Sequence, residues 1–370
     1  MSDDPATHEA RDHDDRARDD RLTVERVQVS TAYGSGPEGG NSAWVLPDSG
    51  IVVDPGPPGD TAFEHLREGL ADVGLAVADV ADVLVTHWHV DHAGLAPRLA
   101  DAADATLHLH ERDAPLVADY AAARARRVDR DAAALSRWGV PDEHVASLRD
   151  ADSPSPMPDE TAVDALAASD VVGPLSVVET PGHTAGHVAF ALRDTAGGGE
   201  RTADARVLVG DAVLRTVTPN VGGGDTRQSD PLADYRRALD ELAGAGWRAL
   251  PGHGTAFDLA PRLAELREHH RERAGLVLDS LADLADTEGG DRGVTPWAVA
   301  RDRFGDMTGY HVKFGAGEAF AHLQDLVALD VVERVDDDPL RYRPVDAFDA
   351  VPCERVLDDA WRAGHRRRNV

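Results

Sequence analysis

The sequence predicts an α/β layered fold that carries its functional residues at one edge of the sheet. Three observations support this class. Short apolar segments with strand-like patterning alternate with segments of helical periodicity. Polar side chains follow several of the apolar segments directly. The chain of 370 residues, 42% of them hydrophobic, is long enough for one large domain and a smaller one.

The elements of the large domain follow in chain order. Residues 22–30, 43–46 and 50–53 alternate or are apolar like strands, and Asp54-Pro55-Gly56 is a turn signal. Residues 61–75 have helical spacing, and 83–85 and 106–109 are short strands. The remaining predicted elements are helices within 111–168, interrupted at 153–156, strands at 175–179, 187–192, 207–209 and 248–250, and a helix at 232–243.

A smaller, winged-helix-like domain is predicted at the C-terminal end. A helix over 261–284 leads to a linker at 286–291. Helices at 296–304 and 318–329 precede strands at 331–334 and 340–343, the order of two helices and a wing. The predicted domains are a disordered acidic tail at 1–21, a large domain at 22–272 with a helical insertion at 111–170 that caps the site, a winged-helix-like domain at 273–350 and a C-terminal tail at 351–370.

The composition is acidic and almost free of lysine. There are 67 Asp and Glu against 38 Lys and Arg, a formal net charge of −29, and Lys313 is the single lysine. This balance resembles the cytoplasmic proteins of extreme halophiles, whose carboxylate-rich surfaces stay hydrated in brine. One cysteine, Cys353, excludes an intrachain disulfide and a Cys-ligated zinc finger. Without a bilayer-length apolar run or a signal-like N-terminus, a cytoplasmic protein with no membrane contact is expected.

This charge leads to a prediction about salt. At low ionic strength we expect the fold to loosen, because the Debye length grows from about 3 Å at 1 M to about 30 Å at 0.01 M and carboxylate repulsion is no longer screened. Thermal melts in molar and in millimolar NaCl test this expectation. A cooperative melt with full activity in dilute buffer would contradict it.

A dense cluster of potential metal ligands follows the strand at 83–85. The segment Thr86-His87-Trp88-His89-Val90-Asp91-His92 holds three imidazoles and a carboxylate. Residues two apart in an extended chain point the same way, so His87 and His89 can share one metal ion. Asp91 and His92, on the following turn, can reach a second ion roughly 3.5–4 Å away. Such a cluster has little structural use without a cation.

Three further candidate ligands each follow a predicted strand. His183 lies on the turn Thr180-Pro181-Gly182-His183, where glycine lets the backbone approach closely. Asp211 follows a buried strand and is placed to bridge two ions through its two oxygens. His253 belongs to the turn Pro251-Gly252-His253-Gly254. Together with the first cluster, these residues indicate a two-metal site.

These motifs resemble, in order, those of the metallo-β-lactamase-fold hydrolases, over about residues 22–272. The resemblance implies an αββα sandwich as the catalytic domain. It implies that His87, His89 and His183 hold the first ion, that Asp91, His92 and His253 hold the second, and that Asp211 bridges them. Asp54 matches the early Asp of that fold, which supports the metal loop through hydrogen bonds.

The resemblance also implies a reaction. A hydroxide bridging two divalent ions would attack the carbonyl of a small ester, thioester or lactone, with Asp91 and Asp211 as catalytic residues. Nitrogen and oxygen donors suit zinc and leave iron or manganese open. The Thr86–His89 start, the 251–254 turn and the helix at 266–273 look like a lactamase-β-like branch with a C-terminal winged helix. That branch includes a single-strand endoribonuclease, so a metal-dependent endoribonuclease is one alternative, and an iron-dependent persulfide dioxygenase is another.

Partners and substrate contacts are less defined. A small-molecule substrate is expected, a homodimer is open, and nucleic acid is not favoured because Arg366–Arg368 is the only basic run. Substrate-binding residues stay unassigned: Arg215, Asn220 and Arg227 are candidates, although surface loop positions are the favoured interpretation. The remaining assignments are packing for Trp88, structural or exposed positions for His108 and His110, and solvated positions for His269 and His270.

Overall fold

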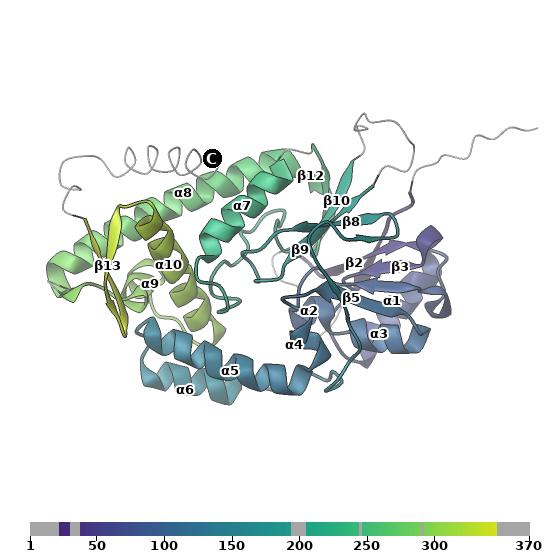
Figure 1. The fold of residues 1–370 in the computed structure, drawn as a ribbon, viewed down its shortest axis with the longest axis horizontal. Coiled ribbons are helices and arrows are strands. Elements are labelled where there is room, and N and C mark those ends of the chain that lie inside the picture. Colours follow the sequence, from purple (N-terminus) through teal and green to yellow (C-terminus); the bar gives the residue numbers. More distant parts are fainter. Residues whose placement is uncertain (1–21, 30–37, 194–204, 244–245, 290–291, 346–370) are drawn as a thin grey trace, which may run out of the picture.

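The computed structural model describes residues 22–29, 38–193, 205–243, 246–289 and 292–345. The predicted tails at 1–21 and 351–370, with Cys353 and Arg366–Arg368, lie outside this range. Two six-stranded sheets form the centre of the fold (Figure 1). The first has the strand order β1-β2-β3-β4-β5-β6 and the second the order β12-β11-β10-β9-β8-β7.

The strands match most of the predicted segments. The first sheet consists of β1 (Glu25–Val29), β2 (Asn41–Leu46), β3 (Ile51–Val53), β4 (Asp82–Leu84), β5 (Thr106–His110) and β6 (Asp164–Leu166). The second consists of β7 (Val171–Val172), β8 (Leu175–Glu179), β9 (Val188–Leu192), β10 (Arg206–Gly210), β11 (Arg248–Pro251) and β12 (Phe257–Asp258). The short edge strands β6, β7 and β12 were not predicted, since two or three residues carry little periodicity.

Helices cover the outer face of each sheet. The helices on the first sheet are α1 (Asp60–Asp72) and α3 (Ala96–Ala103), with the one-turn α2 (Val90–Ala93) before α3. Those on the second are α7 (Pro231–Ala243) and the first half of α8 (Leu259–Leu284). The layer order is helix, sheet, sheet, helix, so the predicted αββα sandwich is confirmed.

The layers are held together by alternating apolar strand residues. In β10, Val207 and Val209 pack with α7 and α8, whereas Leu208 points between the sheets. In β4, Val83 faces the helices and Leu84 the space between the sheets. This period of two is the geometry of a strand that is buried on both faces. The sheets therefore fix the ends of β4, β8, β10 and β11, where the candidate ligands begin.

The C-terminal elements appear in the predicted order. They are α9 (Pro296–Phe304), α10 (Tyr310–Ala328), β13 (Val332–Asp337) and β14 (Leu340–Pro344). Helix α10 begins eight residues earlier than expected, and the boundary drawn after residue 272 falls inside α8. The second half of α8 packs with α9 and α10 rather than with the sheet. One helix thus belongs to two hydrophobic cores.

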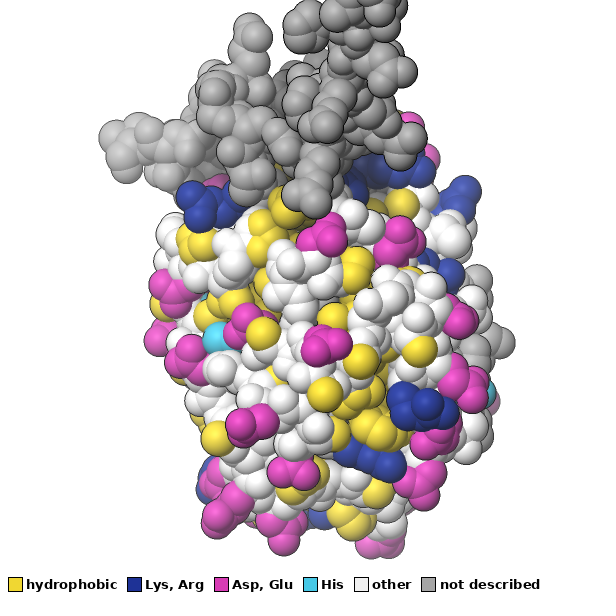
Figure 2. Space-filling view, turned by 90° about the vertical axis from the view of Figure 1, so that its right-hand side faces the viewer, with side chains coloured by type: hydrophobic (Ala, Val, Ile, Leu, Met, Phe, Trp, Pro, Cys, Tyr) yellow, Lys and Arg dark blue, Asp and Glu magenta, His cyan; other side chains and the backbone are white. Residues whose placement is uncertain are grey.

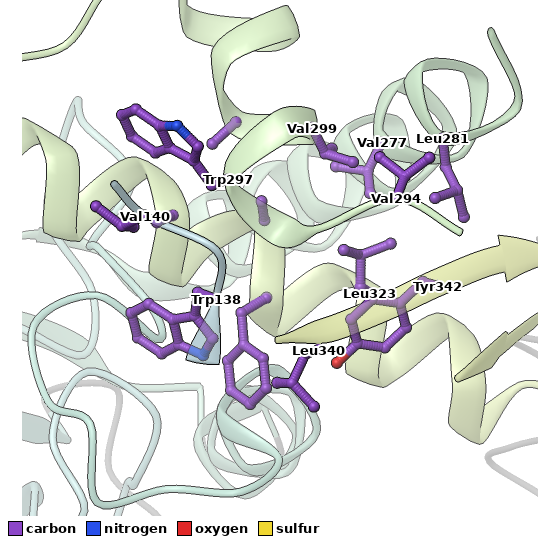
Figure 3. Close-up of a cluster of buried hydrophobic side chains, with 14 of the residues drawn as sticks. Trp138, Val140, Val277, Leu281, Val294, Trp297, Val299, Leu323, Leu340 and Tyr342 are labelled. Atoms are coloured by element: carbon purple, nitrogen blue, oxygen red, sulfur yellow. The ribbon is translucent and has the colours of Figure 1, made fainter. Parts of the chain in front are cut away.

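The insertion joins this C-terminal core. Its helices are α4 (Pro115–Ala118), α5 (Tyr120–Arg137) and α6 (Asp142–Ala151), which end well before residue 168. Trp138, between α5 and α6, stacks on Phe320 of α10 with ring centroids 5.1 Å apart, and Val140 lies in the same cluster as Trp297 and Tyr342 (Figure 3). Figure 1 shows α5 and α6 beside α10. The insertion and the C-terminal unit are therefore packed as one body.

The acidic side chains are dispersed on the one face that Figure 2 shows. On the face shown in Figure 2, Asp and Glu are scattered among apolar and arginine side chains without forming one patch. Among the residues that the structure describes, no helix has both the length and the apolar character to cross a membrane.

Candidate metal centre

Asp54, directly after β3, organises the loop that carries the first ligands. It adopts a left-handed backbone conformation with φ of 53°. Its Oδ1 accepts a hydrogen bond from the Thr86 backbone N–H and its Oδ2 one from Thr86 Oγ1, both at 2.8 Å. His92 Nδ1 lies 3.1 Å from the same Oδ2. One buried carboxylate therefore ties both ends of the 86–92 loop to the first sheet.

His87, His89 and His183 form a compact group of imidazoles. His87 Nε2 lies 3.1 Å from His89 Nδ1, and His183 Nε2 lies 3.0 Å from the same atom. One nitrogen of each ring lies within 4.8 Å of the others, as donors to one ion must. These residues come from the ends of β4 and β8, in the two facing sheets.

Asp91, His92 and His253 form a second group of the same kind. Asp91 Oδ2 lies 3.3 Å from His253 Nε2 and 3.5 Å from His92 Nε2. The turn carrying His253 is fixed to β2, because the Ser42 N–H donates to the Gly252 carbonyl at 2.8 Å and Ser42 Oγ donates to the Gly254 carbonyl at 2.7 Å.

Asp211 lies between the two groups. Its Oδ1 is 3.5 Å from His92 Nε2, and its Oδ2 is 3.4 Å from His253 Nε2 and 4.0 Å from His183 Nε2. It also forms a third possible ligand group with His87 and His92. The structure thus brings all seven predicted ligands together in three overlapping groups.

The centre has the features of a dinuclear metal site. His92 Nε2 and Asp211 Oδ1 are buried without a hydrogen-bond partner, an arrangement that a bound cation would relieve. A Cβ atom on Gly252 would lie 2.5 Å from His92 Cε1 and 2.6 Å from Asp211 Oδ1, so only glycine leaves the space between them open. Nitrogen and oxygen donors without thiolate fit zinc, iron or manganese.

Hydrogen bonds orient the imidazoles toward this space. The carbonyl of Asn220 lies 2.9 Å from His183 Nδ1, which must donate to it, leaving Nε2 free to bind an ion. Thr86 Oγ1 gives its proton to Asp54, so it accepts from His87 Nδ1 at 3.0 Å. In metal-binding histidines, the ring nitrogen that does not bind the ion is typically hydrogen-bonded to a second residue, as it is here.

The pKa values of His87 and His89 are shifted in the opposite direction from those of His92 and His253. Burial, reinforced by neighbouring imidazoles, lowers the pKa of His89 to about 3 and that of His87 well below its ordinary value. Burial also opposes the charged form of His253, but Asp211 and Asp91 outweigh it and raise its pKa to about 9. The same carboxylates raise the pKa of His92. His92 and His253 therefore favour the protonated form at neutral pH when no ion is bound.

Metal binding should accordingly release protons. An ion needs neutral imidazole, so binding at pH 7 must displace the protons of His92 and His253, roughly two per chain. The apparent affinity should rise with pH toward about 9, the pKa of His253, and fall on acidification. Calorimetric zinc titrations at pH 7 in two buffers of different ionisation enthalpy count these protons. A count near zero would contradict the assignment.

Two residues next to the ligands were missed by sequence analysis. Asn41 Nδ2 donates to the Asp91 backbone carbonyl at 2.8 Å and to Asp91 Oδ2 at 3.3 Å, so it fixes that side chain. His187 is buried, and its Nε2 accepts from the Asp211 N–H at 3.2 Å while its Nδ1 faces Thr180 Oγ1 at 2.7 Å. For His187, the only signal in the sequence was the Gly186-His187 pair beside the turn that carries His183.

A buried ionic network beneath the centre was also missed. Asp113 accepts hydrogen bonds from the Trp88 N–H at 3.2 Å, from Thr184 Oγ1 at 2.8 Å and from the Gly186 N–H at 3.0 Å. It therefore connects the 86–92 loop with the turn that carries His183. Arg227 pairs with both Asp113 and Asp225. Nothing in the local sequence distinguishes Asp113 from the other acidic residues.

Several secondary assignments need correction. Arg227 is half-buried and ion-paired with Asp113 and Asp225, which favours a structural role over an open surface position. His270 is buried rather than solvated. His108 and His110 are buried and pair with acidic residues, in keeping with a structural role. Arg215 is exposed and donates to Thr255 Oγ1 at 2.9 Å.

The loop after β10, at residues 220–224, packs between the metal centre and α10. A Cβ atom on Gly222 would lie 2.5 Å from the Gly317 carbonyl oxygen. Lys313 Nζ lies 2.7 Å from Asp131 Oδ2 and 3.4 Å from the Gly224 carbonyl oxygen. The single lysine of the chain thus connects α10, the insertion and the loop beside His183 and His89. Through this loop, the C-terminal unit supports the metal centre.

Comparison with known proteins agrees with this geometry. The family model described as the metallo-beta-lactamase superfamily matches residues 35–253. The probable metallo-hydrolase YqjP of Bacillus subtilis is 28% identical over 231 residues, which cover 60% of this chain and 68% of YqjP. The beta-lactamase-like protein 2 homolog of Caenorhabditis elegans is 25% identical over 257 residues, covering 67% of this chain and 69% of that protein.

Solved structures show the same architecture. A metallo-beta-lactamase family protein from Thermus thermophilus superposes with a TM-score of 0.65 at 28% identity, covering 87% of this chain and 98% of its own. A beta-lactamase domain protein from Burkholderia ambifaria gives a TM-score of 0.65 at 24% identity, covering 87% and 91%, and it supports the fold alone. Both structural alignments cover a larger share of this chain than the family model, which matches residues 35–253.

Proposed function

Because the chain belongs to the metallo-beta-lactamase superfamily and is a metallo-hydrolase of that superfamily, we propose that it hydrolyses small esters, thioesters or lactones at a dinuclear centre. One observation carries the proposal: seven nitrogen and oxygen donors from both sheets lie in three overlapping groups. His87, His89 and His183 would hold one ion, Asp91, His92 and His253 the other, and Asp211 both. The donor set favours zinc.

The protein residues would have different roles in such a reaction. When bound, two divalent ions lower the pKa of a shared water to about 7 and supply hydroxide near neutral pH. Asp91 is the ligand best placed to orient that nucleophile and to carry its proton, because its side chain is 34% exposed whereas His92 is buried. Asn41 holds Asp91 in position through two hydrogen bonds.

Charge near the centre supports an acyl substrate over a nucleic acid. A polyanion needs arginine or lysine side chains that are free to contact phosphates. Arg227 pairs with Asp113 and Asp225, and Arg127 of α5 pairs with Asp131 and Asp152. Lys313 is buried against Asp131. These cations are already neutralised, so an uncharged acyl group is the better match.

A metal assay with a substrate panel tests the proposal. The protein, purified in high salt, is analysed for metals and then offered a thioester, a lactone, an ester, a β-lactam and a single-stranded RNA. We expect two divalent ions per chain and hydrolysis of at least one acyl substrate. Cleavage of RNA alone would refute the acyl assignment, and one iron per chain with oxygen consumption would refute hydrolysis.

A further inference from the structure

The loop after β10, at residues 220–224, touches two of the three histidines of the first ligand group. The backbone carbonyl of Asn220 accepts a hydrogen bond from His183 Nδ1 at 2.9 Å. A Cβ atom on Gly224 would lie 3.3 Å from His89 Cε1 and 3.4 Å from the His183 carbonyl oxygen, so the backbone of the loop lies against both ligands. A displacement of this loop would therefore disturb the first ion position.

A buried ion pair fastens the loop to two helices. Lys313 of α10 is 7% exposed, and its Nζ lies 2.7 Å from Asp131 Oδ2 of α5 and 3.4 Å from the Gly224 carbonyl oxygen. Asp131 Oδ1 accepts a hydrogen bond from Thr226 Oγ1, just past the loop, at 2.6 Å. The C-terminal unit and the insertion thus hold the end of the loop through one pair of opposite charges.

The loop and α10 also pack backbone against backbone. A Cβ atom on Gly223 would lie 2.5 Å from Phe314 Cα and 2.8 Å from the Lys313 carbonyl oxygen. A Cβ atom on Gly317 would lie 2.4 Å from Gly223 Cα. Because no side chain separates them, a shift of α10 is passed on to the loop.

The second ligand group is supported from a different part of the fold. Asn41 of β2 donates two hydrogen bonds to Asp91. Asp54, after β3, lies 3.1 Å from His92 Nδ1. The turn that carries His253 is hydrogen-bonded to β2. These contacts all come from the first sheet, whereas the loop after β10 is held by α5 and α10.

We propose that Lys313 is a positioning residue for the ion held by His87, His89 and His183. Its ammonium joins α10, α5 and the loop, and it thereby keeps His89 and His183 in the arrangement that this ion needs. The C-terminal unit thus sets the affinity of one ion position and leaves the other unaffected. The proposal rests on the dinuclear centre of the proposed function.

Replacing Lys313 by methionine tests the proposal, since methionine keeps an apolar side chain and removes the ammonium. The variant should fold, because Asp131 retains Arg127 Nη1 at 3.2 Å and Thr226 Oγ1 at 2.6 Å as partners. Before zinc is added, hydrogen–deuterium exchange of a peptide over residues 220–227 should become several-fold faster, because the loop loses its attachment to α10. Unchanged exchange in this peptide would overturn the proposal.

Zinc titrations in competition with a chelator assign the effect to one ion. His253→Ala removes a ligand of the second position and His183→Ala removes one of the first, so each leaves one position intact. Adding Lys313→Met should weaken zinc binding about tenfold in the His253→Ala protein and leave it unchanged in the His183→Ala protein. An equal loss in both proteins, or no loss in either, would overturn the proposal. Fewer than two zinc ions on the unmodified protein would refute the dinuclear centre itself, and this proposal with it.

Asp325→Asn gives a matched control for stability. Asp325 lies further along α10, is 3% exposed and forms a buried ion pair with Arg236 of α7. This variant should weaken the packing of the same helix and leave both the exchange of the 220–227 peptide and the zinc affinity unchanged. If it weakened zinc binding as much as Lys313→Met does, loss of stability alone would explain the effect and the positioning role would be wrong.

Thr226→Val provides a second test that does not depend on the folding of Lys313→Met. Valine keeps the shape of the threonine side chain but cannot donate to Asp131. We expect weaker zinc binding in the His253→Ala protein, because the loop loses its other contact with the ion pair. Unchanged zinc binding there would count against the proposal.

Discussion

Replacing Asp211 by alanine should abolish hydrolysis while leaving the fold intact. Asp211 faces both ligand groups, because its Oδ2 lies 4.0 Å from His183 Nε2 of the first group and 3.4 Å from His253 Nε2 of the second. Without it, two imidazoles and one carboxylate remain at the second position, and the charge between two dications is lost. We expect kcat/KM to fall by a factor on the order of 10³ or more, about 4 kcal/mol of transition-state stabilisation.

Metal content and kinetics measured on the same samples check this result. One ion per chain should remain, held by His87, His89 and His183. Asp101→Asn, at an exposed position on α3, removes the same charge away from the centre and should keep full activity. If Asp211→Ala retained both ions and most of its activity, the bridging role would be wrong.

Replacing Asp113 by alanine should destabilise the protein and weaken metal binding together. Asp113 is 0% exposed and joins the 86–92 loop to the His183 turn through three hydrogen bonds. Its loss leaves the Thr184 hydroxyl and two N–H groups without an acceptor and removes one partner of Arg227. We expect the free energy of unfolding to fall by about 3 kcal/mol. The metal affinity should fall roughly 10–100-fold, because the ligand loops lose their common support.

The exposed pair of Asp119 with Arg126 gives a matched control. Asp119→Ala removes an ion pair whose side chains are 52% and 60% exposed, and it should change the unfolding free energy by less than about 1 kcal/mol. Denaturant unfolding and metal titration of both variants make the comparison. An Asp113→Ala protein with unchanged metal affinity would show that the network serves stability alone.

Much of the fold could be predicted from the sequence because its signals are local. The strand Leu175–Glu179 and the helix Pro296–Phe304 have the predicted bounds, since apolar periodicity and a proline at the first helical turn mark them. The seven candidate ligands were found because four of them form one dense motif after β4 and the other three each lie within four residues of a strand end. By contrast, α10 begins eight residues early, across Gly315 and Gly317, which argue against a helix on propensity. Close packing of these glycines against Met307 and the loop at 222–223 outweighs that preference.

The sequence by itself indicated the seven candidate ligands and the acidic character of the chain, because these depend on residue type and spacing. The order of the layers was implied by the resemblance of its motifs to those of a known family. Only the tertiary structure showed that Asp113 is buried, although the sequence contains 67 acidic residues. It also showed that the insertion packs with α10 and that His270 is buried. These properties depend on contacts between residues far apart in the chain. A buried aspartate and a solvated one have the same local sequence, and only the packing around them separates their roles.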